Sequence, residues 1–293
     1  LFRSIEKTEK RQDCALGAGL GAGGAETISD AVIQQVEAQI GSTHAARMVK
    51  LKAWFEDGIN PYRVTRFLRS HDAAGLQAHY AGLAPGEKTG DVVTVAGRIM
   101  IIRNSGMFIV IQDASGRIQT FNDVKNLAPE KLERLHRFDL GDIVGVRGVV
   151  RRTPRGELTI DVEDYLLIAK SLEPLPEKYH GIADPELEVR ERHKSIVSDD
   201  EVRKRLVNRS RIVSAIRRTL EEDGFLEVET PSLHAIAGGA SAKPFVTHHN
   251  ALDTDFCLRI APELYLKRLI ASGISDKVFE IGKNFRNEGL SFK

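Results

Sequence analysis

The segment between residues 91 and 168 places the strongest constraint on the fold of this chain. From Asp91 onward, apolar residues recur at every second position, which is typical of a strand with one buried face. Four further stretches have the composition of strands: Met107–Gln112, Arg117–Phe121, Ile143–Arg152 and Glu157–Ile168. A charged, helix-like segment, Asn126–Phe138, separates the third strand from the fourth. The pattern therefore predicts five strands with a helix between the third and the fourth.

This order of elements is the layout of an OB-fold β-barrel, which we predict for residues 89–170. OB folds bind nucleic acid on the face of strands two and three, by stacking on aromatic rings and by polar contacts to base edges. Candidates for such contacts are Arg103 at the end of the first strand, Phe108 on the second and Gln119 on the third. A shift of one residue in strand phase would turn Phe108 into the barrel and leave Gln119 merely solvated, and this structural alternative stays open.

The residues on either side of the barrel are predicted to form a tail, a helical extension, a linker and a second domain. Residues 1–40 are polar and then Ala/Gly-rich, which favours a flexible tail, although helix-like spacing begins near residue 29. Residues 41–88 are predicted to be a helical N-terminal extension, and the Pro-containing residues 171–189 a linker.

Residues 190–293 mix helical and strand-like patterns, so the chain as a whole is predicted to be α+β. The expected elements are a helix over residues 199–223, a strand Phe225–Glu229, a helix Pro262–Ala271 and a terminal strand Lys277–Arg286.

Arg286 and Glu288, next to the predicted terminal strand, form the clearest chemical pattern. If the strand continues through them, both side chains point to one face, whereas Phe285 and Asn287 point to the other. A guanidinium there can bind a phosphate or a carboxylate through two parallel hydrogen bonds. The alternative is an ordinary ion pair between Arg286 and Glu288, which contributes little to stability when it is exposed.

The Phe285–Glu288 pattern resembles motif 2 of the class II aminoacyl-tRNA synthetases, and Gly224–Pro231 resembles motif 1 of the same family. The resemblance implies that residues 190–293 are the start of an antiparallel-sheet catalytic domain, and that the OB-fold is the anticodon-binding domain of class IIb. Several stretches look like the lysyl members of class IIb: Gly58–Tyr62, Tyr179–Asp184, Gly238–Asn250 and Arg259–Lys267. The segment Arg192–Ser195 departs from the Arg-Tyr-Leu-Asp that these members usually have.

The resemblance implies roles for residues of the second domain. In this family the motif 2 Arg binds the α-phosphate of ATP and the carboxylate of the amino acid, which implies a catalytic, ATP-binding role for Arg286. Glu288 is then expected near the adenine amino group. Gly239 and Ala261 are expected to shape the lysine pocket. Glu263 is expected to bind the α-ammonium of lysine, where aspartyl-type members usually have Gln.

The resemblance also implies roles for the barrel and for the assembly. In class IIb a Phe on strand two and a Gln eleven residues later recognise the middle uridine of the anticodon, helped by an Arg. Phe108 and Gln119 keep this spacing, and Arg103 is the matching Arg. Pro231 of motif 1 is expected at the interface of a homodimer. The implied reaction charges tRNA-Lys with lysine through lysyl-adenylate, and it uses ATP and Mg²⁺.

Composition restricts the partners and the location. The net charge is only +1, so a nucleic-acid surface must arise from local clustering of basic residues. The cysteines, Cys14 and Cys257, form no CxxC pattern, and adjacent His248 and His249 point apart on a strand, so we expect no metal site within this chain. No apolar run is long enough for a membrane span, and we expect a cytoplasmic protein without a membrane partner.

The chain ends at Lys293, soon after the motif 2 pattern, which leads us to expect Mg²⁺ ligands beyond residue 293 and an inactive isolated chain. Two alternatives remain at this stage. One is an aspartyl- or asparaginyl-type class IIb synthetase. The other is a non-catalytic OB-fold RNA-binding protein with a remnant of a synthetase domain.

Overall fold

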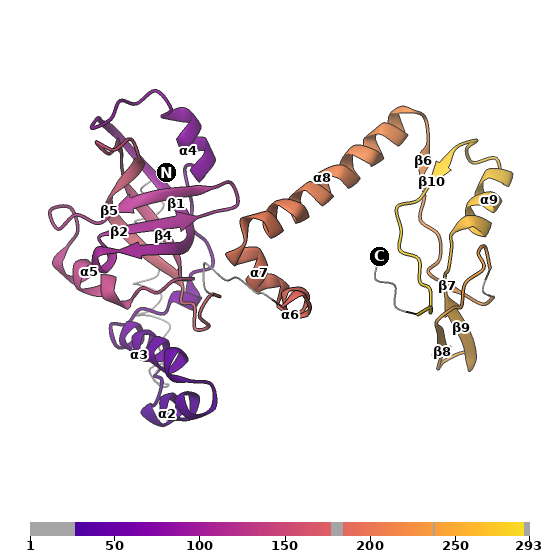
Figure 1. The fold of residues 1–293 in the computed structure, drawn as a ribbon, viewed down its shortest axis with the longest axis horizontal. Helices are drawn as coiled ribbons and strands as arrows, with labels where there is room; N and C mark the ends of the chain where they lie inside the picture. Colours follow the sequence, from indigo (N-terminus) through magenta and orange to yellow (C-terminus); the bar gives the residue numbers. More distant parts are fainter. Residues whose placement is uncertain (1–26, 177–183, 237, 290–293) are drawn as a thin grey trace, which may run out of the picture. The chain divides into compact units, whose positions relative to one another are not determined.

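The computed structural model describes residues 27–176, 184–236 and 238–289, which belong to two compact units (Figure 1). We refer to the residues up to Ala183 as the barrel unit and to those from Asp184 as the C-terminal unit. The division falls inside the predicted linker, residues 171–189. Part of that linker, most of the predicted tail and part of the Tyr179–Asp184 stretch lie outside the described residues.

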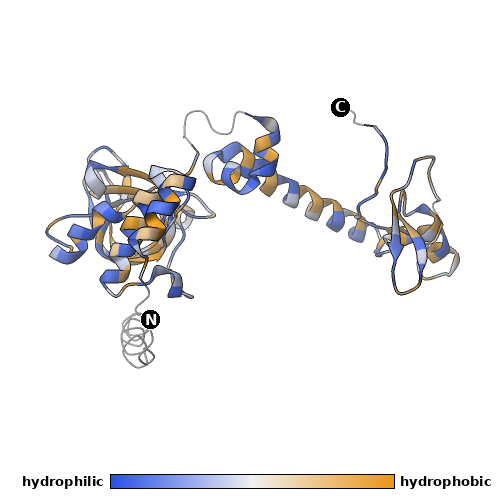
Figure 2. Ribbon diagram, turned by 90° about the horizontal axis from the view of Figure 1, so that it is seen from below, coloured by the Kyte–Doolittle hydropathy of each residue, from blue (hydrophilic) through white to orange (hydrophobic). Residues whose placement is uncertain are grey.

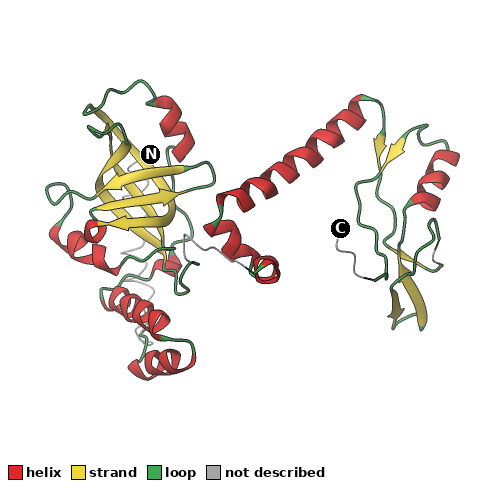
Figure 3. Ribbon diagram, in the orientation of Figure 1, coloured by secondary structure: helices red, strands yellow, loops and turns green. Residues whose placement is uncertain are grey.

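A closed five-stranded barrel forms the centre of the barrel unit (Figure 3). Its strands are β1 (Lys88–Arg103), β2 (Phe108–Gln112), β3 (Arg117–Phe121), β4 (Ile143–Arg152) and β5 (Leu158–Ala169). They pair in the order β1-β2-β3-β5-β4, and only β3 and β5 are parallel. Helix α5 (Pro129–Arg134) and the 3₁₀ turn η3 (Leu135–Arg137) connect β3 to β4. The predicted OB-fold is confirmed, helix position included.

Branched apolar side chains fill the interior of the barrel. In Figure 2, where orange marks hydrophobic residues, many segments of the barrel strands are orange. On β2, Ile109 and Ile111 are only 3% and 1% exposed, and Ile118 on β3 is 1% exposed. Each such side chain contributes about 1.5–3 kcal/mol through its burial. Because successive residues of a strand face opposite sides, Phe108 and Val110 on β2 face outward.

The N-terminal extension consists of α2 (Asp30–Gln39), α3 (Ser42–Glu56), the 3₁₀ turn η1 (Pro61–Arg63) and α4 (Ala73–His79). Helix α2 begins after Ser29, whose hydroxyl accepts a hydrogen bond from the backbone N–H of Val32 at 3.4 Å. The prediction of a flexible tail reaching residue 40 is therefore wrong for residues 30–39. A serine N-cap and apolar helical spacing outweigh the Ala/Gly-rich composition that precedes them.

Trp54 attaches α3 to the barrel unit. Its side chain is 2% exposed, and its ring stacks on that of Phe138 with a centroid distance of 6.0 Å. The guanidinium groups of Arg134 and Arg137 lie 6.0 and 5.7 Å from the Trp54 ring, and both groups bind Asp57 at the end of α3. The helix is thus held by one aromatic contact and by ion pairs at its C-terminal end.

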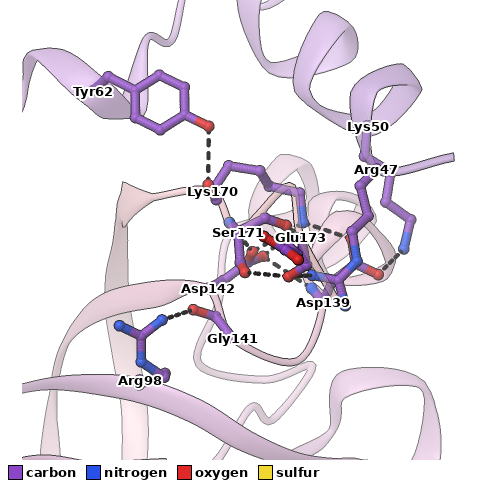
Figure 4. Close-up of polar contacts among 10 residues, drawn as sticks. All are labelled: Arg47, Lys50, Tyr62, Arg98, Asp139, Gly141, Asp142, Lys170, Ser171 and Glu173. Carbon is purple, nitrogen blue, oxygen red and sulfur yellow. Dashed lines mark hydrogen bonds and ion pairs between the residues drawn. The ribbon is translucent and has the colours of Figure 1, made fainter. Parts of the chain in front are cut away.

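A buried charged cluster holds the start of α3 and the end of β5 together (Figure 4). The ammonium of Lys170, with a fully buried side chain, lies 2.5 Å from Asp139 and 2.8 Å from Asp142. Asp139 also binds Lys50 of α3 at 2.6 Å. Arg47 donates from the same helix to the backbone carbonyls of Ser171 and Glu173 (2.8 and 3.1 Å). Buried charges of this kind are tolerated only because they are paired.

The C-terminal unit begins with three helices, α6 (Pro185–Arg190), α7 (Arg192–Ser198) and α8 (Asp200–Glu222). Short strands follow: β6 (Leu226–Glu227), β7 (Leu233–His234), β8 (Val246–His249) and β9 (Thr254–Leu258). Helix α9 (Glu263–Ala271) and strand β10 (Val278–Phe279) come last. The pairings are β10 with β6 in parallel, and β7-β9-β8.

The predicted terminal strand Lys277–Arg286 is wrong beyond Phe279, where β10 ends. From Glu280 onward the described backbone is irregular, and it is fixed by single contacts instead of a strand ladder. The side chain of Arg259 donates to the carbonyl of Lys283 at 2.9 Å, and the N–H of Phe285 donates to the carbonyl of Arg259 at 2.9 Å. Period-two alternation in the sequence is shared by any extended segment, and it does not reveal whether a partner strand is present.

Candidate functional site

The outer face of β2 and β3 carries the predicted aromatic residue. Phe108 lies outside the barrel core and is partly exposed, so the alternative in which it fills the interior is excluded. In the β2–β3 pairing Phe108 lies opposite Phe121, and their ring centroids are 4.8 Å apart. An aromatic surface therefore lies next to solvent, as stacking on a base requires.

Arg103 lies directly opposite Phe108 in the β1–β2 pairing, with an exposed side chain. Both residues flank a tight 3₁₀ turn, η2 (Asn104–Gly106), whose three residues all have positive φ. Asn122 holds the turn, since its side-chain amide donates to the carbonyl of Gly106 at 2.7 Å. The guanidinium is thus presented at the edge of the aromatic surface, where it can reach a phosphate or a base.

Gln119 lies on the same outer face, opposite Val110 on β2 and Thr159 on β5. Its side-chain amide is partly buried and donates from Nε2 to the hydroxyl of Thr159 at 3.0 Å. Arg103, Phe108 and Gln119 thus sit on three adjacent strands and one face. This arrangement combines a stacking surface with groups that can contact a base edge and a phosphate.

Two further residues of this face were not predicted from the sequence. Phe121 follows Gln119 by two positions on β3, so period-two reasoning could have found it. Arg151 lies on β4, which is separated from β3 by β5, and its guanidinium carbon is 4.7 Å from the centroid of the Phe121 ring. It forms an ion pair with Asp161, a carboxylate that also binds Lys88 at 2.9 Å. No local signal links residue 151 to residue 121.

The C-terminal unit brings together the three residues predicted for a lysine pocket. Gly239 has φ +89°, and an added Cβ there would lie 3.4 Å from the Cβ of Ala261 and 3.6 Å from that of Glu263. Such a backbone favours glycine. The carboxylate of Glu263 is half exposed and lies 2.5 Å from the ammonium of Lys267 in the next turn of α9. It thus already binds one ammonium group.

Arg286 and Glu288 are both exposed, on the irregular segment that follows β10. The N–H of Asn287 donates to the carbonyl of Lys243 at 2.7 Å. Together with the bond from the N–H of Phe285 to the carbonyl of Arg259, it fixes the backbone on both sides of Arg286. Within the described ranges, Arg286 and Glu288 form no ion pair with each other, so the alternative of a plain ion pair is not observed. The guanidinium is open to solvent and to an anion.

A buried network missed in the sequence supports this segment. Arg259 is 3% exposed and binds Glu280 at 2.5 Å and the Thr230 hydroxyl at 2.9 Å. Burial alone would raise the pKa of Glu280, but hydrogen bonds from Thr230 and Arg259 outweigh it and hold that pKa below its usual value. Gly282 leaves room for the network, because a Cβ there would lie 2.0 Å from Nη2 of Arg259 and would force that side chain to shift.

The remaining predicted residue, Pro231, is exposed, and its carbonyl lies 3.0 Å from Nε2 of His234. In the part of the chain that the structure describes, no cluster of three or more His, Cys, Asp or Glu residues could hold a metal ion. Over the same described ranges, no helix combines the length and the apolar character needed to span a membrane.

Two family models match the two units. Residues 93–168 match the OB-fold nucleic acid binding domain, and residues 184–293 match the family described as tRNA synthetases class II (D, K and N). These ranges agree with the barrel and with the C-terminal unit.

The chain is also similar to several curated lysine–tRNA ligases. It is 56% identical to that of Rhizobium meliloti (strain 1021) over 226 residues, which are 77% of this chain and 45% of that protein. It is 53% identical to that of Sinorhizobium medicae (strain WSM419) over 84% of this chain and 49% of the relative. It is 46% identical to that of Clostridium botulinum (strain Langeland) over 90% of this chain and 52% of the relative. The chain thus spans about half the length of the curated relatives it matches. With an OB-fold barrel followed by a class II synthetase domain, it belongs to the class II aminoacyl-tRNA synthetases.

Proposed function

We propose that this protein works as a lysine–tRNA ligase whose barrel binds the anticodon of tRNA-Lys. The observation that carries the proposal is the outer face of the barrel, where Arg103, Phe108 and Gln119 lie on adjacent strands. The names of the relatives support lysine as the amino acid, against an aspartyl- or asparaginyl-type enzyme. The class II domain supports an enzyme over a purely RNA-binding protein.

The proposed reaction has two steps, and the protein contributes to it by positioning and charge. The lysine carboxylate attacks the α-phosphorus of ATP, which releases pyrophosphate and gives lysyl-adenylate. The 3′-terminal ribose of tRNA-Lys then takes the lysyl group and AMP leaves. We assign Arg286 to the α-phosphate and the lysine carboxylate, where a guanidinium neutralises developing charge. Glu288 is assigned to the adenine amino group. Mg²⁺ accompanies the phosphates of ATP.

The lysine pocket is assigned to Gly239, Ala261 and Glu263. The contact between Glu263 and Lys267, an i,i+4 pair on α9, supports this assignment as an example of an ammonium group bound by the carboxylate. The α-ammonium of lysine would replace the Lys267 ammonium as its partner. Pro231 is assigned to the interface of a homodimer, and we place the enzyme in the cytoplasm.

Binding of anticodon stem-loops tests the proposal with the chain as it stands. The loops carry UUU, UCU or GUC, and the ionic strength is fixed because phosphate contacts dominate affinity. We expect the chain to bind UUU most tightly. Phe108→Ala should weaken UUU binding by about 5- to 150-fold, since stacking is worth about 1–3 kcal/mol per base.

Val49→Ala is the matched control, because Val49 is an apolar residue on α3 that is 51% exposed. It should leave binding unchanged. Equal affinity for all three loops would reject anticodon reading and favour a general RNA-binding barrel. A preference for GUC would favour an aspartyl-type enzyme.

A further inference from the structure

Thr159 lies directly behind Gln119 on the outer face of the barrel. The two residues are register partners in the parallel β3–β5 pairing, and Nε2 of Gln119 lies 3.0 Å from Oγ1 of Thr159. Thr159 is fully buried, with 0% of its surface exposed. The partner of the amide is therefore a fixed protein hydroxyl that the fold holds in place.

A second hydrogen bond of Thr159 fixes the polarity of the first. The hydroxyl lies 3.3 Å from the backbone carbonyl of Glu157, which can only accept, so the Thr159 proton points there. The lone pairs of Oγ1 are then left for Gln119, which must offer its NH₂ side. The same carbonyl also accepts the N–H of Thr153 at 2.9 Å, which holds it in place.

The consequence is that Gln119 has its carbonyl oxygen available for a ligand. Nε2 is directed at Thr159, and Oε1 accepts no hydrogen bond from the described residues. A freely rotating amide can present either a donor or an acceptor, and so can pair with uracil or with cytosine. Uracil carries a donor at N3, whereas cytosine carries an acceptor there. At N3, an outward Oε1 can accept from uracil and not from cytosine, whose donor on this edge is the N4 amino group at a different position.

We propose that Thr159 is a positioning residue that locks the amide of Gln119, so that the barrel prefers uracil to cytosine at the base Gln119 contacts. This inference rests on the proposed anticodon-binding role of the face. Thr159 itself touches no base, and its effect passes through the orientation of Gln119. It should therefore alter the ratio of affinities for two bases more than affinity itself.

The test compares stem-loops that differ only in U or C at the middle position. Thr159→Val removes the hydroxyl and keeps the shape, whereas Thr159→Ser keeps the hydroxyl. We expect Thr159→Val to lower the U/C affinity ratio by about three- to tenfold, the worth of one hydrogen bond. Thr159→Ser should stay within about twofold of wild type. Thr159→Ala repeats the removal of the hydroxyl without a new methyl contact.

The controls separate this inference from the proposed function. Gln119→Ala should abolish the U/C preference, and Phe108→Ala should weaken both loops alike. A U/C ratio unchanged in both Thr159→Val and Thr159→Ala, but lost in Gln119→Ala, would overturn the role of Thr159 and leave anticodon binding intact. Absence of any U/C preference in the wild-type chain would overturn both.

Discussion

Phe108 and Phe121 form a tilted aromatic pair across β2 and β3, with ring centroids 4.8 Å apart and 38° between the ring planes. The guanidinium of Arg151 lies over Phe121 and is itself bound by Asp161. Phe121 is thus held by a cation and in turn holds Phe108. The stacking surface for a base is therefore supported from β4 and β5 as well as from its own hairpin.

Phe121→Leu should weaken stem-loop binding without changing base preference. An aromatic pair is worth about 0.5–1.5 kcal/mol beyond burial, so we expect a loss of about 2- to 12-fold for UUU and UCU loops alike. Fluorescence anisotropy at fixed salt measures both affinities. A change in the U/C ratio as large as that of Thr159→Val would contradict this separation of roles.

Lys170→Met should strongly destabilise the barrel unit, because it leaves Asp142 buried without its cation. Removal of one partner of a buried pair typically costs about 3–5 kcal/mol. Trp54 is the chain's single tryptophan and is buried in this unit, so its fluorescence in a urea titration reports this transition.

The double variant Lys170→Met with Asp142→Asn serves as the control for that experiment. It removes both charges, so it should be more stable than Lys170→Met alone. If the double variant is as unstable as the sum of its single variants, the two residues are not coupled.

Acid should destabilise the barrel unit partly through Asp113. Burial alone would raise the pKa of Asp113, but hydrogen bonds from the Ser115 hydroxyl and from the N–H groups of Ala73, Gly116 and Ser115 lower it. Because the pKa is lower in the folded state, the ionised carboxylate stabilises the fold fully above the unfolded-state pKa of about 3.9. This stabilisation is lost as the pH falls through the folded-state pKa. Urea titrations of Trp54 fluorescence at pH 6 and at pH 3 should show a smaller loss of stability for Asp113→Asn than for wild type. An equal loss would mean that other carboxylates carry the acid response.

Gly282→Ala should disrupt the C-terminal unit. The new Cβ would lie 2.0 Å from Nη2 of Arg259 and 2.8 Å from a carboxylate oxygen of Glu280, so their ion pair must move. We expect faster hydrogen exchange for the segment around Glu280–Phe285, with unchanged exchange in the barrel. Gly289→Ala is the matched control, because nothing lies within 4 Å of its added Cβ. Similar exchange in both variants would show that Arg259 does not fix the segment.

The barrel could be predicted from the sequence because its signal is local. Alternation along Ile109, Ile111 and Ile118 follows from the pleat of each strand, and the helix after β3 has its own pattern. The phase of β2 needed the structure, since one residue decides whether Phe108 faces inward or outward. Gln119 could be named from spacing, but its bond to Thr159 joins residues 40 positions apart.

The C-terminal unit shows where local signals fail. Extended character near Arg286 is visible in the sequence, but the contacts that fix it come from far along the chain; the side chain of Arg259 reaches the carbonyl of Lys283 from 24 positions away. Likewise, Lys170 and Asp142 read as ordinary surface charges, and only the folded chain makes them a buried pair. Such contacts depend on tertiary packing and leave no periodic trace.

Arg47 connects the N-terminal extension to the residues that follow the last strand of the barrel. Its hydrogen bonds to the carbonyls of Ser171 and Glu173 fasten the first residues after β5 to a helix that precedes the barrel. The position of Ser171 and Glu173 after the barrel is therefore fixed partly from the N-terminal side. Proteolysis that removes α3 would leave both carbonyls without Arg47, although the N–H of Ser171 would still donate to Asp142 of the barrel unit.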